Sequence, residues 1–241
     1  MTAPSCPYPE GCPVPDPDPA VVRRVRTSTL DAGVELFRGH RRAYPADRLV
    51  PGAGNSRFAP LAEVAHAYVS RRATPALLES AFHDATPPQP RIYPHRLAAW
   101  SLSRVRLVAD VRLIDLRDPE LQRLGIDRSQ LVTSLPAHYA CTRDWAAALH
   151  GRHVGGQPTH GLLWHSRQAE LHAAADHNPL TADLLGPGET TEVAVVYAPP
   201  APHRLLEDSN QGPGPLAEGE GQRFARAVGN LIGAAIYPPR L

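Results

Sequence analysis

The sequence contains no lysine, and all 25 of its Lys/Arg residues are arginine. A mechanism that depends on a lysine base or a lysine Schiff base is therefore excluded. The 24 acidic residues nearly balance the arginines, and the formal net charge is +1. A chain without an overall positive field lacks the electrostatic footprint of a nucleic-acid-binding protein, so we expect no direct binding of nucleic acid.

Cysteine is also scarce, since the 241 residues include only Cys6, Cys12 and Cys141. Three cysteines do not make a disulfide framework, and the histidines show neither an H-E-x-x-H motif nor clustered Cys/His spacing. Cys6 and Cys12 lie in a proline-rich segment, where they either pair or oxidise, or belong to a free tail; we expect the free tail. The sequence alone therefore leads us to expect no metal.

Long apolar runs are missing as well. No run approaches the roughly 18 residues of a membrane span, and no basic stretch followed by an apolar core marks a secretory signal. We therefore expect a cytoplasmic protein with no membrane segment. The 42% hydrophobic content supports a real core, and 241 residues suit one domain of ordinary size with elaborations.

Composition and periodicity divide the chain into three parts. Residues 1–30 are expected to be a loosely packed, proline-rich tail with a short helix over 21–30. Residues 31–200 are expected to form the main domain, and residues 201–241 a loop followed by a C-terminal helix over 224–236 that packs on it. Strand patterns occur at 34–38, around 68, over 97–116, at 161–166 and at 193–197, and helices are expected over 75–83, from 118, and over 142–150. This mixture without strict alternation predicts an α+β fold, a compact mixed sheet with flanking helices.

Arg57, Tyr68 and Glu79 follow one another at intervals of eleven residues. Eleven residues is about three helical turns, so on one helix the three side chains would share a face. The proline at position 60 breaks such a helix, the residues around Tyr68 suit a strand, and a new helix begins near Thr74. The three residues are thus predicted on a loop, a strand and a helix, and only the fold can bring them together.

Seven segments occur in a specific order between about residues 34 and 198: "LFRGH", "GNSRFAPL", "AYVS", "TPALLES", "VRLIDLRDPELQRLGI", "TRDWAAALH" and "THGLLWHSR". In this order and spacing they resemble the RES domain family, toxins of bacterial toxin–antitoxin pairs that are usually encoded with an Xre-type antitoxin. Two positions depart from the family pattern. Gly39 stands where the family has a larger residue, which predicts a looser pocket for the nicotinamide part of the substrate. The loop at 54–60 also differs from the corresponding segment of the family.

The resemblance implies a fold related to ADP-ribosyltransferases and a chemistry on NAD, which family members split at the nicotinamide–ribose bond. Water, phosphate or a protein accepts the ADP-ribose. Arg38, Arg57, Tyr68, Glu79 and Ser166 take the motif positions. The resemblance also implies a cognate antitoxin whose C-terminal part covers the NAD pocket, and a homodimer of the toxin.

The proposed chemistry suits these residue types. Loss of nicotinamide builds positive charge on the ribose, and one carboxylate beside the ring, Glu79, can stabilise that charge. Arginine binds a pyrophosphate with a planar fork, for which Arg38 and Arg57 are the candidates. Tyr68 is a candidate for stacking on nicotinamide or ribose. The alternatives are a solvated helix glutamate, surface arginines and a core tyrosine.

Three further residues complete the predicted site. Ser166, at the end of a strand, is expected to hydrogen-bond the substrate or to orient Glu79, and no Gly-x-Ser-x-Gly context makes it a nucleophile. His40 follows Arg38 closely and either touches the substrate or is an ordinary loop histidine. Phe37 belongs to the aromatic–arginine pair of the first motif.

The sequence therefore predicts an NAD-consuming toxin that uses NAD as substrate and needs no metal. Two alternatives remain: a protein ADP-ribosyltransferase of the same fold, and a catalytically silent module that binds NAD. The sequence does not distinguish them, because the acceptor of ADP-ribose binds to loops that carry no aligned motif.

Overall fold

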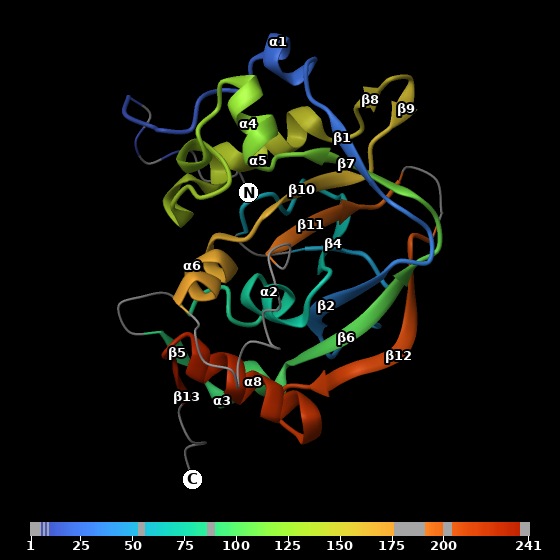
Figure 1. The fold of residues 1–241 in the computed structure, drawn as a ribbon, viewed down its shortest axis with the longest axis vertical. Helices are drawn as coiled ribbons and strands as arrows, with labels where there is room; N and C mark the ends of the chain where they lie inside the picture. Colours follow the sequence, from blue (N-terminus) through green and yellow to red (C-terminus); the bar gives the residue numbers. More distant parts are fainter. Residues whose placement is uncertain are drawn as a thin grey trace.

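A computed structural model describes residues 6, 8, 10–52, 56–85, 90–175, 191–199 and 204–236 of the chain. Its main feature is a mixed sheet in which the strands lie in the order β1-β7-β10-β11-β4-β2-β6-β12, with β3 paired to β4 (Figure 1). All neighbours are antiparallel except β7 and β10, which are parallel. The strands span Thr27–Leu30 (β1), Glu35–Arg41 (β2), Val50–Pro51 (β3), Ala65–Ser70 (β4), Trp100–Leu107 (β6), Val111–Asp115 (β7), Gly161–His165 (β10), Glu192–Tyr197 (β11) and Leu206–Pro215 (β12).

Helices lie at both ends of this sheet and against its middle (Figure 1). The helices α1, α4 and α5 lie beside β1 and β7, α3 and α8 lie near β6 and β12, and α2 and α6 lie between these groups. The helices span Pro19–Val22 (α1), Ala73–Leu78 (α2), Pro94–Ala98 (α3), Asp118–Leu124 (α4), Tyr139–Leu149 (α5), Arg167–Ala175 (α6) and Gly219–Leu231 (α8), with 3-10 turns at Arg128–Gln130 and Pro136–His138. Two small ribbons pair β5 (Arg91–Ile92) with β13 (Ala235–Ile236) and β8 (His153–Val154) with β9 (Gln157–Pro158).

The core falls into three apolar clusters. One lies under α4 and α5, where Trp164 of β10 meets Phe58 edge-on at 5.0 Å between ring centroids. A second packs α2 and α8 against β6, with Leu78 and Val228 fully buried. The third contains Leu36 of β2 and its neighbours on other strands. Burial of such side chains, at about 25 cal/mol per Å² of apolar surface, is the main force that holds the sheet and helices together.

The sheet opens between β2 and β4. Their ladder consists of one residue pair, Phe37 opposite Ser70. By contrast, β2 pairs with β6 along its whole length, from Glu35 to Arg41. Beyond Phe37 the next residues of β2 therefore face β4 across a gap, and this gap is where the candidate site lies.

Most of the expected elements are confirmed, and so is the α+β class. The strand patterns correspond to β2, β4, β6, β7, β10 and β11, and the helix expected from 118 is α4. Gly125 ends α4 in the left-handed conformation, with φ of 75°. The helix expected over 75–83 is shorter, since α2 ends at Leu78 and Glu79 is its C-cap. The helix expected over 142–150 begins earlier, at Tyr139.

Two expectations near the ends of the chain are wrong, and the bounds of a third are shifted. The helix over 21–30 forms only as α1, and the β-branched residues that follow make β1 on the edge of the sheet. The loop expected between residue 201 and the C-terminal helix contains β12, an irregular edge strand whose register shifts accommodate its glycines and prolines. The C-terminal helix is α8, which begins at Gly219 and ends at Leu231, and the residues expected at its end form β13 instead.

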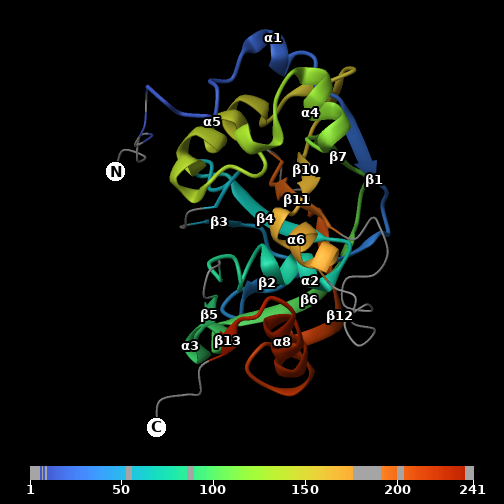
Figure 2. The same ribbon diagram turned by 60° about the vertical axis from the view of Figure 1, so that its left-hand side comes forward.

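The N-terminal tail is also better packed than expected, from residue 10 onward. Val14 and Val22 are buried in the cluster under α5. The indole Nε1 of Trp145 on α5 donates a hydrogen bond to the carbonyl of Pro15 at 2.6 Å. Figure 2 shows this N-terminal segment running beside α5. Among the described residues, no helix is both long and apolar enough to cross a membrane.

Candidate active site

A cavity of about 510 Å³ lies at the gap between β2 and β4. Its volume is in the range of pockets that hold cofactor-sized ligands, about 300–1,000 Å³. Its lining includes Arg38, Gly39, His40 and Arg41 of β2, His66 and Tyr68 of β4, and Glu79, Ser80, His83 and Asp84 after α2. Four of the predicted site residues therefore share one cavity: Arg38, His40, Tyr68 and Glu79.

Glu79 owes its position to the end of α2 and to a hydrogen bond from β10. As the C-cap of α2 it has left the helical conformation, with ψ of 3°. The hydroxyl of Ser166, which is fully buried, donates to Glu79 Oε1 at 2.6 Å. The same hydroxyl accepts the backbone N–H of Ala169 at 3.2 Å, in the first turn of α6. Ser166 does not line the cavity, so in this structure it orients the carboxylate that does.

Arg38 is a buried cation at the cavity wall. Only 4% of the residue is exposed, and Nη1 donates to the carbonyl of Ala46. Burial lowers the pKa of the guanidinium to about 10, although Asp47 counteracts part of this shift. The group therefore stays charged at neutral pH. A buried permanent cation in a cavity favours an anionic ligand, because low polarity strengthens the attraction.

His40 is held from both ring nitrogens. Nδ1 lies 3.1 Å from the carbonyls of Arg41 and Tyr44, and Nε2 lies 3.0 Å from Ser103 Oγ. Burial lowers the pKa of His40, and the charge of Arg38 adds to this effect. A neutral His40 that donates from Nδ1 shapes the cavity wall rather than supplying a second charge.

Tyr68 contributes a neutral hydroxyl and an aromatic wall. Its oxygen accepts the backbone N–H of Phe58 at 3.2 Å and lies 2.9 Å from Ser56 Oγ. Burial raises the pKa of Tyr68, and the nearby charge of Glu79 raises it further. The ring packs edge-on against Trp164 at 5.8 Å, so the side chain has little freedom to move.

Arg57 and Phe37 lie outside this cavity lining. The Nη1 of Arg57 donates to the carbonyl of Ser134 at 2.9 Å and to its hydroxyl at 2.6 Å, and the guanidinium stacks on the ring of Tyr139 at 5.0 Å. Phe37 alternates with Arg38 along β2, where its ring lies 5.1 Å below the guanidinium of Arg104. In this structure both residues make contacts with the protein, and a direct role of either in substrate binding stays a prediction.

Close packing of β2 against the end of α2 explains why position 39 is a glycine. A Cβ at this position would overlap the hydroxyl of Ser80, approach Ser80 Cβ to 2.7 Å and approach the carbonyl of Ala76 to 3.2 Å. A larger residue would therefore push the end of α2 away from β2. Glycine here lets Glu79, next to Ser80, sit at the cavity wall. Of the altered loop at 54–60, residues 54 and 55 lie outside the described part of the chain.

The sequence did not single out several other residues of the cavity. Trp100 lines it, and its indole Nε1 is buried without a hydrogen-bond partner among the described atoms. Tyr44 is 44% exposed and also lines it. Arg96 enters from α3 and pairs with Asp84 at 2.6 Å between Nη1 and Oδ2. None of these residues lies in one of the family motifs, and their spacing along the sequence does not identify them as cavity residues.

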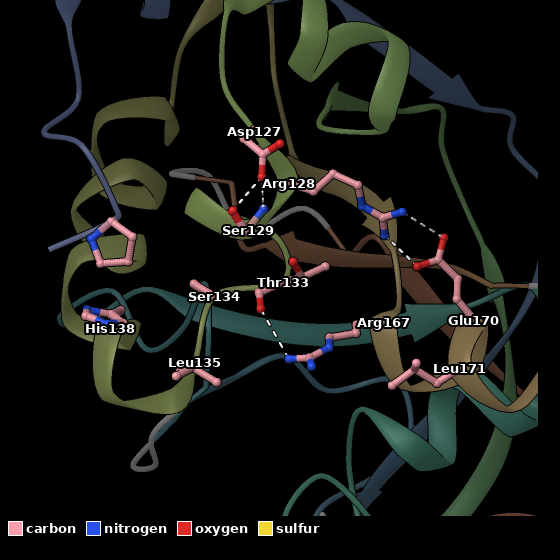
Figure 3. Close-up of a pocket in the computed structure, with 11 residues that line it drawn as sticks. Asp127, Arg128, Ser129, Thr133, Ser134, Leu135, His138, Arg167, Glu170 and Leu171 are labelled. Atoms are coloured by element: carbon pink, nitrogen blue, oxygen red, sulfur yellow. Dashed lines mark hydrogen bonds and ion pairs between the residues drawn. The ribbon is translucent and has the colours of Figure 1, made fainter.

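A second cavity, of about 800 Å³, lies between the 3-10 turns and α6 (Figure 3). Arg167 extends across it toward the carbonyl of Thr133, 3.4 Å from Nη1. At the edge of the cavity, Arg128 Nη2 forms an ion pair with Glu170 Oε2 at 2.5 Å. Leu135 also lines the cavity. This cavity holds none of the predicted site residues, but Ser134 on its wall contacts Arg57.

Comparison with known proteins agrees with these observations. A family model described as the RES domain matches residues 35–210, and the chain belongs to this family. The resemblance seen in the motifs is thus confirmed. The chain is also similar to a chain in the crystal structure of the M. tuberculosis MbcT–MbcA toxin–antitoxin complex, with 17% identity, a TM-score of 0.49, and coverage of 79% of this chain and 91% of that one. No curated protein matches the sequence.

Proposed function

We propose that this protein consumes NAD by cleaving the nicotinamide–ribose bond, and that it acts as a cytoplasmic toxin. The observation that carries the proposal is the carboxylate of Glu79, held by the buried Ser166 hydroxyl at 2.6 Å in the wall of a cavity that also contains a buried arginine. Membership of the RES domain family supports the toxin role.

Glu79 would act on the charge that develops during cleavage. Nicotinamide leaves as a neutral ring, so the reaction needs no general acid, and positive charge builds on the ribose. A carboxylate fixed beforehand next to the ribose stabilises that charge without reorganising during the reaction. The bond from Ser166 supplies this fixed orientation.

The rest of the cavity suits an anionic, aromatic ligand. Its charged lining comprises the cations Arg38, Arg41 and Arg96 and the anions Glu79 and Asp84. The excess of arginine favours the pyrophosphate. Tyr68 and Trp100 add aromatic surfaces to the same lining, which suit the ring of such a ligand.

The acceptor of the ADP-ribose is water or phosphate in this proposal. Transfer to a protein is the second candidate, and a silent NAD-binding module is the third. Because NAD depletion stops growth, the proposal includes a cognate Xre-type antitoxin that covers the pocket. A homodimer of the toxin is part of the same proposal.

Expression in a sensitive bacterial host, with cellular NAD followed over time, separates these candidates. The proposed toxin arrests growth while NAD falls, and Glu79→Ala does neither. A protein-modifying enzyme arrests growth with little early loss of NAD and labels protein from radiolabelled NAD. If wild-type and Glu79→Ala cells grew alike with equal NAD, the toxin proposal would have to be abandoned.

A further inference from the structure

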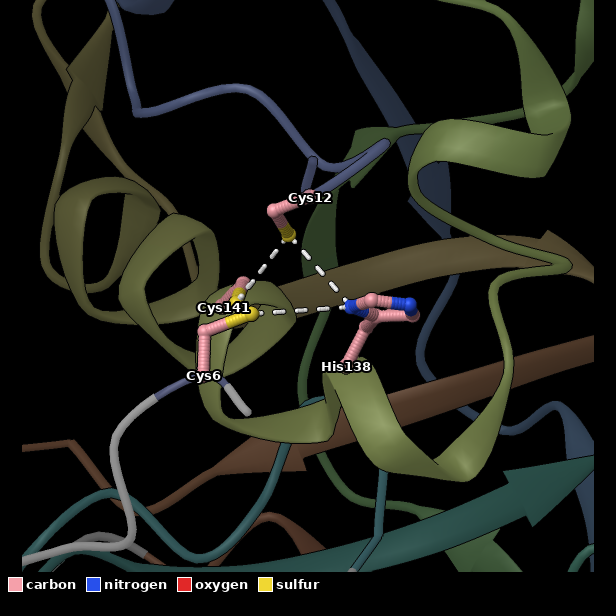
Figure 4. A group of neighbouring side chains, drawn as sticks. All are labelled: Cys6, Cys12, His138 and Cys141. Carbon is pink, nitrogen blue, oxygen red and sulfur yellow. Dashed lines mark hydrogen bonds between the residues drawn. The ribbon is translucent and has the colours of Figure 1, made fainter. Parts of the chain in front are cut away.

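All three cysteines of the chain meet at one place. Cys6 and Cys12 lie in the N-terminal segment and Cys141 lies in α5, yet their sulfur atoms gather around Nδ1 of His138 (Figure 4). The four potential ligand atoms all lie within 4.8 Å of one another. We propose that Cys6, Cys12, His138 and Cys141 bind a structural zinc ion, which fastens the N-terminal segment to the catalytic domain.

The distances fit a tetrahedral metal site. Cys12 Sγ lies 3.6 Å from Cys141 Sγ and 3.4 Å from His138 Nδ1, and Cys6 Sγ lies 3.7 Å from the same nitrogen. With Zn–S bonds of about 2.3 Å and Zn–N bonds of about 2.0–2.1 Å, a regular tetrahedron separates two sulfurs by about 3.8 Å and a sulfur from the nitrogen by about 3.5 Å. These three separations therefore match edges of a zinc tetrahedron, and the four ligand atoms, all within 4.8 Å of one another, lie near its corners.

The donor set selects the metal and its role. Three thiolates and one imidazole nitrogen are soft and borderline ligands, which favour zinc over magnesium or calcium. Four protein ligands leave no open position for water or substrate, which is the pattern of a structural site and not of a catalytic one. Binding requires the thiolate forms, so the cysteines release their thiol protons to solvent as the metal enters.

The backbone presents these ligands from two segments of the chain. Just before Cys12, the N–H of Gly11 donates to the carbonyl of Tyr8 at 3.2 Å. His138 ends the 3-10 turn before α5, and Cys141 lies on the first turn of that helix. His138 is 6% exposed, so the ring already occupies a defined place. The buried imidazole, whose Nδ1 lies close to three sulfurs, is thus already placed to coordinate a metal.

The same turn carries contacts of the candidate active site. Between His138 and Cys141 lies Tyr139, whose ring supports the guanidinium of Arg57 at 5.0 Å. The hydroxyl of Tyr139 lies 3.3 Å from Nε2 of His83, a residue of the NAD cavity wall. A metal at His138 and Cys141 would thus stiffen the segment that holds Arg57 in place. The expectation of no metal depended on spacing along the sequence, which does not reveal residues that meet only in the fold.

The test is the metal content of the full-length protein, purified in reducing buffer with zinc supplied during synthesis and loose metal removed by gel filtration. We expect about one zinc per chain. Cys12→Ser lowers zinc retention against a competing chelator by about tenfold or more. His153→Gln, at an exposed histidine outside the cluster, retains full zinc. Cobalt in place of zinc gives the visible absorption of a tetrahedral thiolate site.

Thiol reactivity keeps the proposal testable if the cysteine variant does not fold. In the wild-type protein the three thiols react slowly with a thiol reagent and become reactive when a strong chelator is added. A wild-type protein without zinc whose three thiols react at once would overturn the proposal. So would a single reactive thiol after denaturation of protein prepared without reductant, which indicates a disulfide in place of the metal.

Discussion

Replacement of Ser166 by alanine tests how the candidate site is positioned. The hydroxyl of Ser166 donates to Glu79 Oε1 at 2.6 Å, and the residue is fully buried, so no water replaces the lost donor without rearrangement. A hydrogen bond to a charged group is worth about 1.5–3 kcal/mol. If that energy holds Glu79 in its reactive orientation, its loss slows turnover by about 10- to 150-fold.

The assay is nicotinamide release from NAD by purified protein, with kcat and KM determined separately. We expect Ser166→Ala to lower kcat while KM changes little, because the hydroxyl acts through Glu79 and not on the substrate. The matched control is Ser209→Ala, which removes a hydroxyl bound to the carbonyl of Arg104 at 2.7 Å on an edge strand. It should leave kcat unchanged. An unaltered kcat in Ser166→Ala, at equal stability, would refute the positioning role.

Three further predictions concern packing, the role of Arg57, and pH. Gly39→Ala forces Cβ into Ser80 and should cost about 1–3 kcal/mol of stability, seen as a lower urea midpoint; an unchanged midpoint contradicts the packing argument. Arg57→Lys keeps the charge but loses the fork, so we expect a lower thermal midpoint together with weaker NAD binding in calorimetry; a variant equal to wild type in both rules out either role. Burial raises the pKa of Asp115, but the hydrogen bonds from Arg117 outweigh this and leave it below the ordinary 3.8. The Asp115 carboxylate therefore stabilises the fold above that pH, and this contribution is lost as pH falls through the lowered pKa. Asp115→Asn should have a lower free energy of unfolding than wild type at pH 7, and the difference should shrink near pH 3. Equal differences in the free energy of unfolding at both pH values, measured by urea titration, argue against this linkage.

The parts of the fold that the sequence predicts well are those with strong local patterns. The strands around Phe37 and Tyr68 and the stretch before Glu79 carry β-branched residues, alternation or a proline near a helix start, and each of these acts over a few residues. β12 has none of them, because its glycines and prolines resemble a loop. It becomes a strand only because the edge of β6 is available to pair with it.

The candidate site shows the same limit. The motifs bring Arg38, Tyr68 and Glu79 to attention, and the fold places all three on one cavity. Arg57 was expected at the pyrophosphate, but its contacts are with carbonyls from a segment more than 70 residues away, which local spacing does not reveal. The convergence of Cys12 and Cys141 across 129 residues was out of reach for the same reason.

The most direct test of the account is nicotinamide release by the purified protein, compared between wild type, Glu79→Gln and Glu63→Gln. Glu79→Gln keeps the shape of the side chain and its bond to Ser166 while removing the charge, and Glu63 is an exposed glutamate outside the cavity. The account predicts release by wild type and Glu63→Gln, and a loss of about 100-fold or more in Glu79→Gln with the fold intact. Equal rates for wild type and Glu79→Gln, or no release by wild type with or without phosphate, would contradict it.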